Sequence, residues 1–515
     1  MLRPPDRMGN PALRRFFPAA VFLYMAGLYG FLHMQAGGLA ERAGYFHARF
    51  AGMLPELGLA RSFAWIQAGA LGERFFDPAF LYHALLAPFA RGAEPLGGFL
   101  LGSTLLSASL FPLLHGFLAR QRVPAPWVPT LLLACLGSPF LLRLWFTDSH
   151  VLASLLLVAG LAPLIEERWR WALAFGVLWS WSRAFVFVYP AVALIFAAAR
   201  WSGGEATDEE GGRLPRAFDW RSPAAAAAGL AAGLLLHPQS PAGLTALASQ
   251  AGAAFESFRA GSVAAVAASG DWVTPYSPRG IWHVYPLVTA LVLSGGFACW
   301  QEKGGLRSET LGLLAAAGFG LVMTLGTQSG IEYAAPLTAA AFGLLWRDSL
   351  WGLAGPLRAW AEAGRRRRVL AGIFAAAVLA QAAVLAPLLP QIRGLRPPRF
   401  RGAAAWLAAN LAPGETAANL WWSDFPELFY DGRSQRYLAG LEPFYGRGPA
   451  DSAGARLERM RSGMDPIDPS WLSRTFGARF LVLRAGYVKH YPQLAGWRSV
   501  YRDTAAAVYE LPALP

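Results

Sequence analysis

Charged residues are scarce in this chain. Only 15% of the 515 residues are charged, whereas soluble domains carry roughly 25%. This deficit argues against an ordinary soluble protein and indicates that much of the chain lies in lipid. Lysine is nearly absent, with only Lys303 and Lys489, so the net charge of +13 comes almost entirely from arginine.

Cysteine is equally rare. Cys135 and Cys299 lie far apart in the sequence, each inside an apolar run. Two such thiols make neither a disulfide framework nor a cysteine-based zinc site. We therefore expect two small, buried, apolar side chains.

The arginines stand in short segments between apolar runs. This arrangement is typical of cytoplasmic loops of membrane proteins, and it differs from the continuous basic face of a nucleic-acid-binding domain. We expect no nucleic-acid partner. The clusters fall on one side of the membrane when the N-terminus is cytoplasmic and the first apolar segment stays uncleaved.

Apolar runs are abundant, because 55% of the residues are hydrophobic. About eleven of them are predicted to be membrane-spanning helices, although the run at 171–181 is shorter than the ~20 residues of a full span. The predicted spans are residues 16–33, 97–118, 127–145, 151–165, 171–181, 184–199, 223–236, 283–300, 310–325, 334–346 and 369–389. The chain is thus predicted to be a multi-pass protein of the bacterial cytoplasmic (inner) membrane.

The composition changes after residue 389. Helical spacing is present at 401–411 and 456–461, and strand patterns at 416–420, 479–483 and 505–511. The predicted fold is an α-helical polytopic membrane domain (1–389) followed by a small α/β domain (390–515). The arginine pattern places the second domain on the extracytoplasmic side.

The segment 39–95 lies between two apolar runs and is too polar to span a bilayer. It contains side chains capable of proton chemistry, among them Glu41, His47, Asp77 and His83. Long loops of this kind commonly carry function. Other ionisable residues predicted near the outer face, where burial close to lipid is costly, are Asp148, His150, Arg183, His237, Glu256, Arg259, Asp271 and Glu332.

Three stretches carry a resemblance to a known family. The first is Ala43-Gly44-Tyr45-Phe46-His47-Ala48-Arg49, the second is Phe75-Phe76-Asp77-Pro78-Ala79-Phe80-Leu81-Tyr82-His83, and the third is Trp421-Trp422-Ser423-Asp424-Phe425-Pro426. In these motifs and in its layout, the chain resembles a bacterial branch of the GT-C superfamily of polytopic glycosyltransferases. That superfamily includes oligosaccharyltransferases, protein mannosyltransferases and aminoarabinose transferases.

The resemblance implies a function. A GT-C glycosyltransferase moves a sugar from a polyprenyl-phosphate-linked donor within the membrane to an extracytoplasmic lipid, glycan or protein acceptor. Such a reaction needs a carboxylate near the sugar carbon as general base. Metal-dependent members also use a divalent cation such as Mg²⁺ or Mn²⁺ to neutralise the phosphate leaving group. Guanidinium groups bind phosphate well, so the candidates for binding the donor phosphate are Arg183, Arg259 and Arg279 on the outer face, and the sequence does not select among them.

One position departs from the family pattern. Ala43 stands where the oligosaccharyltransferases have an acidic residue, and a methyl group neither accepts a proton nor binds a metal. The predicted base is therefore Asp77, supported by Glu41, His47 and His83. A structural role for Asp77 is equally compatible with the sequence: Asp77 as a helix N-cap, with Pro78 as the first helical residue.

Two alternatives follow. The loss of the acid at Ala43 also fits a catalytically inactive GT-C-like scaffold or accessory protein in envelope polysaccharide assembly. A transporter or lipid flippase ranks last, because the sequence has neither the internal repeats nor the paired broken helices expected of one.

Overall fold

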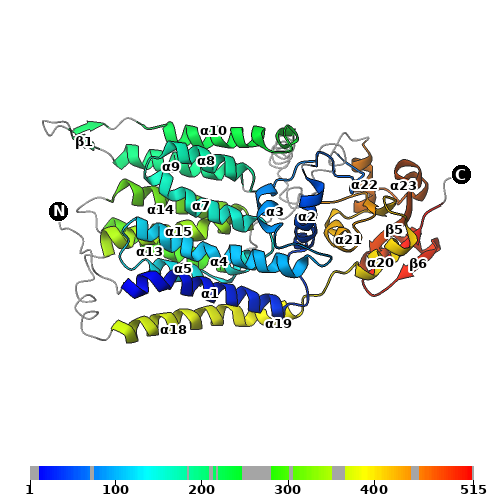
Figure 1. Cartoon of the computed structure of the whole chain (residues 1–515), viewed down its shortest axis with the longest axis horizontal. Coiled ribbons are helices and arrows are strands. Elements are labelled where there is room, and N and C mark those ends of the chain that lie inside the picture. Colours follow the sequence, from blue (N-terminus) through cyan, green and yellow to red (C-terminus); the bar gives the residue numbers. More distant parts are fainter. Residues whose placement is uncertain are drawn as a thin grey trace.

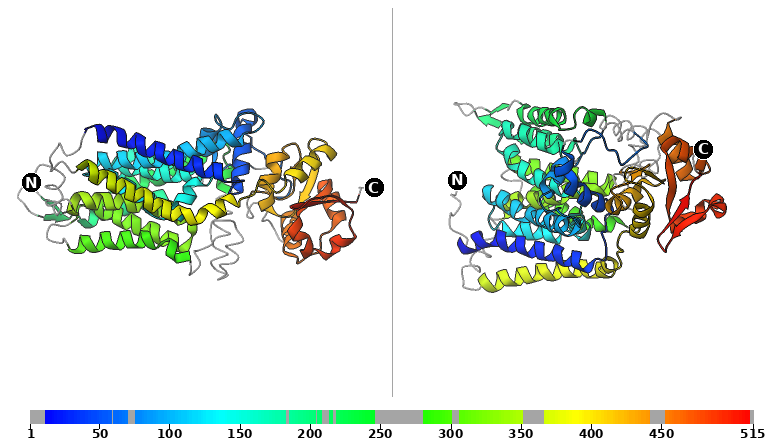
Figure 2. Two further views of the ribbon diagram at one scale, coloured as in Figure 1. Left: turned by 90° about the horizontal axis from the view of Figure 1, so that it is seen from below. Right: turned by 45° about the vertical axis from the view of Figure 1, so that its right-hand side comes forward.

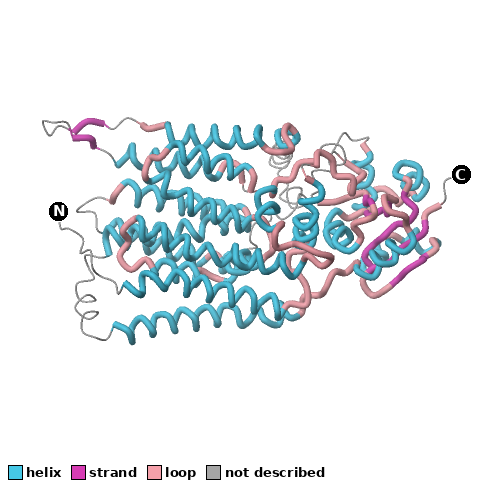
Figure 3. The backbone as a smooth tube through the Cα atoms, viewed as in Figure 1, coloured by secondary structure: helices cyan, strands magenta, loops and turns pink. Residues whose placement is uncertain are grey.

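The computed structural model describes residues 11–58, 60–69, 75–182, 185–203, 205–207, 213–215, 218–245, 280–300, 306–350, 366–441 and 452–512. A bundle of long helices occupies most of the molecule, and a small sheet with its own helices lies beyond one end of it (Figure 1). Apart from the short pair β1 (Glu205–Thr207) and β2 (Arg213–Pro215) at the other end of the bundle, the described strands gather in that sheet region (Figure 3).

The bundle helices follow the apolar runs of the sequence, because a long apolar helix satisfies its own backbone groups in lipid. Their bounds are α1 Pro11–Gln35, α4 Leu96–Arg120, α5 Trp127–Cys135, α6 Ser138–Trp145, α7 His150–Ile165, α8 Trp169–Ser180, α9 Val188–Gly203, α10 Arg221–Leu236, α13 Tyr285–Trp300, α14 Ser308–Gly326, α15 Ile331–Leu345, α18 Arg366–Leu385 and α19 Leu389–Arg393. Pairs such as α8 with α10, α14 with α15 and α1 with α4 pack closely.

Four segments of the described chain are long and apolar enough to cross a bilayer. They are Phe16–Gln35, Leu96–Arg120, Ser308–Gly326 and Ala375–Arg393. Several other apolar helices have only 10–17 residues, fewer than the ~20 of a full span. The helical, membrane-protein character of the chain is thus confirmed, while the number of about eleven spans stays a prediction.

The predicted span at 127–145 is wrong as a single straight helix. The chain forms α5 and α6, which meet at an angle of 91°. Gly137 between them has φ = 118°, a value that favours glycine, and Pro139 follows at the start of α6. The turn between α6 and α7 places Asp148 3.3 Å from His47 of the segment 39–95.

The C-terminal region contains a five-stranded sheet with the order β4-β3-β5-β7-β6. Strand β3 pairs in parallel with both β4 and β5, while β7 pairs antiparallel with β5 and β6. The strands are β3 Thr416–Asn419, β4 Arg436–Tyr437, β5 Ala478–Arg484, β6 Ser499–Arg502 and β7 Ala506–Glu510. The helices of this region are α20 Arg401–Asn410, α21 Phe425–Asp431, α22 Ala453–Ser462 and α23 Pro469–Phe476.

The segment 39–95 joins the bundle to this sheet. It contains α2 (Ala43–Leu57) and α3 (Phe80–Leu86), which lie between the two parts in Figures 1 and 2. Between these helices, the backbone of Gln67 and Ala68 donates to the carbonyls of Tyr437 and Leu438 at 2.9 and 3.0 Å. The segment therefore extends the sheet by a short parallel pairing beside β4.

A proline at position 67 tests this backbone pairing. Gln67→Pro removes the N–H that bonds Tyr437 O, and we expect a loss of roughly 1 kcal/mol for that hydrogen bond. Faster hydrogen–deuterium exchange at Ala68 and Tyr437 is the expected measurement. Gln67→Ala keeps the backbone donor and serves as the control; equal protection in the two variants would contradict the pairing.

Candidate functional site

Aromatic rings hold α2 and α3 against the C-terminal region. Phe46 and Phe50 of α2 form one buried cluster with Phe63 of the segment 39–95 and with Phe425 and Phe429 of α21. Burial of large rings is a major favourable contribution to packing. This cluster fixes the position of α2 and the side chains beside it.

His47 lies on the buried face of α2. Its side chain is 3% exposed, and its ring packs edge-on against Tyr82 with centroids 5.7 Å apart. Two residues further along α2, Arg49 donates through Nε to the carbonyl of Tyr430 at 2.8 Å and lies over that tyrosine ring. The contact ties the same helix to α21.

Asp77 precedes α3 and is also 3% exposed. Its Oδ1 accepts from the N–H of Ala79 at 3.0 Å, while its own N–H donates to Oε1 of Gln239 at 2.6 Å. The predicted N-cap with Pro78 in the first helical position is wrong, because α3 begins only at Phe80. The carboxylate instead closes a local turn ahead of the helix.

A chain of hydrogen bonds links the two histidines to this carboxylate. His83 Nδ1 lies 2.7 Å from Asp77 Oδ2, and His83 Nε2 lies 2.7 Å from His47 Nδ1. His83 is fully buried. A buried carboxylate that bonds an imidazole orients the ring and stabilises its cation, so the arrangement is suited to taking up and passing a proton.

The hydrogen-bonded residues Asp77, His83 and His47 line a small cavity. Its wall contains Ala43, His47, Asp77 and His83, and the C-terminal region contributes Pro426 and Leu441. The volume of about 60 Å³ accommodates a few waters or one functional group, and it is much smaller than the ~300–1,000 Å³ of a typical small-molecule site. Ala43 thus lies at the same cavity as Asp77, and its methyl group supplies no acid there.

The other predicted site residues have different positions. Glu41 is not among the residues that line the cavity; its Oε1 accepts from the N–H of Ala43 at 3.3 Å, at the start of α2. Arg183, Arg259 and Arg279, the predicted phosphate-binding residues, lie outside the described residues. Their role therefore stays a prediction.

The structure adds residues that the sequence did not single out as part of this site. Gln239 bridges the segment 39–95 by accepting from Asp77 N and donating to the carbonyl of Ala60 at 2.8 Å. His237 is buried beside Phe76 and Phe80. Burial lowers the pKa of His237, and the nearby Asp77 opposes that shift. The sequence had named His237 among the ionisable residues near the outer face, whereas Gln239 lay only in the polar stretch His237-Pro238-Gln239-Ser240 after an apolar run.

Ionic contacts continue from His47 into the bundle. Asp148 lies between α6 and α7, with Oδ1 3.3 Å from His47 Nε2 and Oδ2 3.3 Å from His150 Nδ1. Next to them, Arg143 donates through Nε to Oε1 of Glu332 at 2.6 Å. Glu332 is 2% exposed, and an ion pair is the expected way to bury such a charge.

The aromatic motif of the C-terminal region contributes mainly to packing. Tyr430 and Tyr437 are buried in its core, and Asp424 forms a buried ion pair with Arg484. Burial raises the pKa of Asp424 to about 6, although Arg484 acts in the opposite direction. The cavity beside His47 is therefore the stronger candidate for acid–base chemistry.

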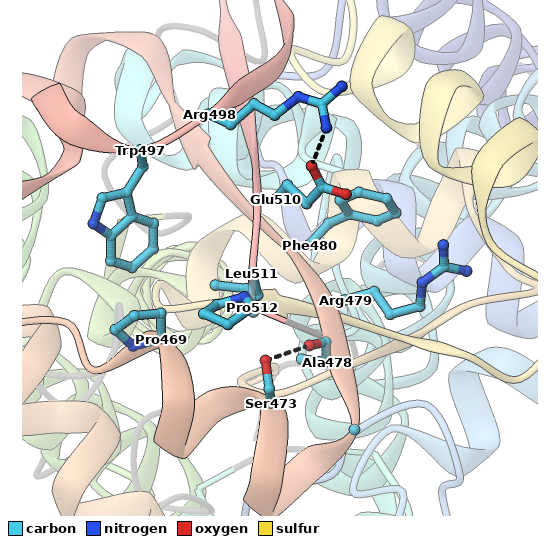
Figure 4. A pocket seen from close by; sticks show the side chains of 11 residues that line it. Pro469, Ser473, Ala478, Arg479, Phe480, Trp497, Arg498, Glu510, Leu511 and Pro512 are labelled. Atoms are coloured by element: carbon cyan, nitrogen blue, oxygen red, sulfur yellow. Dashed lines mark hydrogen bonds and ion pairs between the residues drawn. The ribbon is translucent and has the colours of Figure 1, made fainter. Parts of the chain in front are cut away.

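A larger hollow of about 760 Å³ lies elsewhere on the C-terminal region (Figure 4). Trp497 faces Pro469 and Pro512 across it, and Arg498 pairs with Glu510 at 2.8 Å. None of its lining residues belongs to the histidine chain. Its size fits a ligand, but its charged groups form ordinary exposed ion pairs.

A divalent cation finds no ready site among the described residues. No three histidine, cysteine, aspartate or glutamate side chains there are placed to bind one ion together. His47 and His83 instead bond each other directly at 2.7 Å, which leaves no room for an ion between the two nitrogens. The described residues do not fit a metal at this cavity.

Comparison with known proteins identifies the fold. No protein-family model matches the sequence, and no curated protein matches it. Among solved structures, the oligosaccharyltransferase AglB from Archaeoglobus fulgidus, in complex with an inhibitory peptide and a dolichol-phosphate, is similar with a TM-score of 0.60 and 13% identity, over 92% of this chain and 70% of that one. A second structure of the A. fulgidus oligosaccharyltransferase, in complex with Zn and sulfate, gives a TM-score of 0.53 and 14% identity, over 95% and 73%.

ArnT from Cupriavidus metallidurans, bound to undecaprenyl phosphate, is similar with a TM-score of 0.57 and 14% identity, over 96% of this chain and 98% of that one. The chain therefore has a GT-C-like fold, and the resemblance seen in the sequence is confirmed at that level. Identity this low shows the fold alone.

A double-mutant cycle tests the Asp77–His83 bond. We expect Asp77→Asn and His83→Gln to destabilise the protein and to be coupled by about 1.5–3 kcal/mol, because the bond joins a buried charge to its donor. Chemical denaturation of the detergent-solubilised protein measures the unfolding free energies.

The exposed pair Asp465–Arg459, at 2.8 Å, is the matched control. Its coupling, measured with Asp465→Asn and Arg459→Gln, should be about 0.2–1 kcal/mol. Additive effects at Asp77 and His83 would show that their contact contributes nothing.

Proposed function

We propose that this protein transfers a sugar from a polyprenyl-phosphate-linked donor to an extracytoplasmic lipid, glycan or protein acceptor. The observation that carries the proposal is the buried Asp77–His83–His47 chain at a cavity of a GT-C-like fold. The fold adds support, because a similar structure, ArnT, was solved with undecaprenyl phosphate and another, AglB, with a dolichol-phosphate.

In this proposal the histidine pair takes up the proton of the acceptor. Asp77 is buried and bonds Nδ1 of His83, so in this proposal the carboxylate acts through the imidazole. The proton enters at Nε2 of His47, the nitrogen of the pair that bonds neither Asp77 nor the other imidazole. His47 and His83 both line the cavity. Asp77 is then a positioning residue that holds His83 in the correct tautomer and stabilises its cation.

The reaction is a displacement at the anomeric carbon. The acceptor oxygen forms a bond to that carbon, the bond from the carbon to the phosphate oxygen breaks, and the electron pair leaves with the polyprenyl phosphate. The acceptor proton passes to the histidine pair. Arg183, Arg259 and Arg279 are proposed to bind the phosphate, as guanidinium groups do, and Glu41 to support the start of α2 beside the cavity.

The orientation is part of the proposal. The arginine clusters favour a cytoplasmic N-terminus, which would place the cavity and the C-terminal region outside the cytoplasmic (inner) membrane of a bacterium. The cavity residues come from α2, α3 and the C-terminal region, which lie together beyond one end of the bundle (Figure 2). A lipid-linked donor would reach this end from the membrane.

A second candidate function rests on Ala43. Because a methyl group occupies the cavity wall at this position, a GT-C-like protein without transferase activity, acting as a scaffold in envelope polysaccharide assembly, is the alternative. It predicts that the wild type releases no polyprenyl phosphate and that Ala43→Asp restores release.

The test uses the full-length protein in proteoliposomes with a panel of undecaprenyl-phosphate-linked monosaccharides. Release of undecaprenyl phosphate is measured for the wild type, Asp77→Asn, His83→Gln and His47→Gln. We expect a 10²–10⁴-fold loss of kcat, the usual contribution of acid–base catalysis. Asp465→Asn, in an exposed ion pair of the C-terminal region, is the control and should keep wild-type turnover. Unchanged kcat in His47→Gln and His83→Gln would overturn the assignment.

A further inference from the structure

The chain of titratable groups does not end at His47. Asp148 bridges two imidazoles, with one carboxylate oxygen 3.3 Å from His47 Nε2 and the other 3.3 Å from His150 Nδ1. His150 is the first residue of α7. Five groups therefore form one continuous series, from Asp77 through His83, His47 and Asp148 to His150.

The two ends of the series fix where protons lie. His83 Nδ1 faces a carboxylate oxygen of Asp77, so this nitrogen carries a hydrogen. At the other end, His150 Nε2 lies 2.7 Å from the carbonyl oxygen of Arg143. A carbonyl only accepts, so Nε2 of His150 also carries a hydrogen.

Each carboxylate also accepts a hydrogen bond from a backbone amide. Asp77 Oδ1 accepts from Ala79 N at 3.0 Å, and Asp148 Oδ1 accepts from Ser149 N at 2.6 Å. Hydrogen bonds from amide groups stabilise an anion more than a neutral acid. At rest the added protons are therefore assigned to the histidines, and Asp148 holds one only during transfer.

A proton count follows from these constraints. Five contacts need one proton each: Asp77–His83, His83–His47, His47–Asp148, Asp148–His150 and the His150–Arg143 carbonyl bond. Three neutral histidines supply three of them. Two more protons complete the series, one on His150 and one within the His47–His83 pair. The two cations then balance the two carboxylates.

We propose that these five groups are a proton relay, with Asp148 as the bridge between the cavity and the start of α7. One proton below the full number leaves a single contact empty. A proton taken up by the histidine pair leaves Nε2 of His47 for Oδ1 of Asp148, Asp148 carries it briefly as a neutral acid, and rotation of that carboxyl group delivers it to Nδ1 of His150. The inference rests on the proposed function in one respect only: that function supplies the proton, which comes from the acceptor.

Other ionisable groups face the relay. Glu332 Oε1 of α15 lies 3.9 Å from His150 Nδ1 and is paired with Arg143 of α6. His237 faces Asp77 after the end of α10, Tyr82 of α3 packs against His47, and Glu41 lies close enough to act on Arg143. Glu332 and Arg143 compensate each other and keep the far end of the relay close to neutral.

The experiment is NMR of the full-length chain, labelled with ¹⁵N-histidine and reconstituted in nanodiscs. The eight histidines are assigned by single substitutions. In the wild type we expect a coupling across the His83–His47 hydrogen bond and imidazole signals of His47 and His150 that titrate together. Separate titrations of His47 and His150 in the wild type would overturn the relay, and this measurement needs no variant.

Asp148→Asn tests the bridge. Loss of the carboxylate should lower the titration midpoints of both His47 and His150 by about one pH unit or more, as expected for an opposite charge removed from within ~4–6 Å. Asp465→Asn, in an exposed ion pair, should leave both midpoints unchanged. Unaltered midpoints in Asp148→Asn would contradict the proposal.

Measurement of turnover distinguishes a failure of the relay from a failure of the proposed function. If undecaprenyl phosphate is released, Asp148→Asn should lower kcat and displace its pH profile while KM stays constant, and Asp148→Glu should recover part of kcat. An unchanged kcat pH profile would contradict the relay even with a transferase confirmed. If no donor is released, the proposed function fails, while the coupled titration in the wild type still decides the relay.

Discussion

The buried carboxylate of Asp77 is the interaction on which the site depends. An ionised group at 3% exposure is costly unless it is fully hydrogen-bonded. Ala79 N and His83 Nδ1 supply donors to its two oxygens. Ala79 N reaches Asp77 through the turn before α3, and His83 Nδ1 reaches it because of the position of α3. The burial of this carboxylate therefore depends on the local backbone conformation.

The positions of Asp77 and its hydrogen-bond partners depend on both parts of the molecule. His83 contacts His47, and α2 is held by aromatic packing against α21 of the C-terminal region. The backbone pairing beside β4 adds a second attachment. The segment 39–95 and the C-terminal region thus form one cavity together, whose wall includes Pro426 and Leu441.

Much of the fold could be predicted from the sequence because hydrophobic periodicity is a local signal. The helices α4, α7, α10 and α14 begin and end within a few residues of the predicted runs, and the strands β3, β5 and β7 lie where the alternation indicated. The helix predicted at 127–145 is broken into α5 and α6, because Gly137 adopts a conformation that apolar periodicity does not report. The edge strands β4 and β6 were missed, since they are short and depend on their neighbours.

The sequence by itself determined the apolar bundle, the C-terminal α/β region, the resemblance to the GT-C superfamily and the importance of Asp77, His47 and His83. It named Asp148, His150 and Glu332 only as ionisable residues near the outer face, because no local pattern connects residues as distant in sequence as His47 and Asp148 or His150 and Glu332. Only the tertiary structure decided that His47 bonds His83 and approaches Asp148, and that both oxygens of Asp77 are occupied. The physical reason is that hydrogen bonds act over about 3 Å, so the partner of a buried charge is set by packing rather than by sequence spacing.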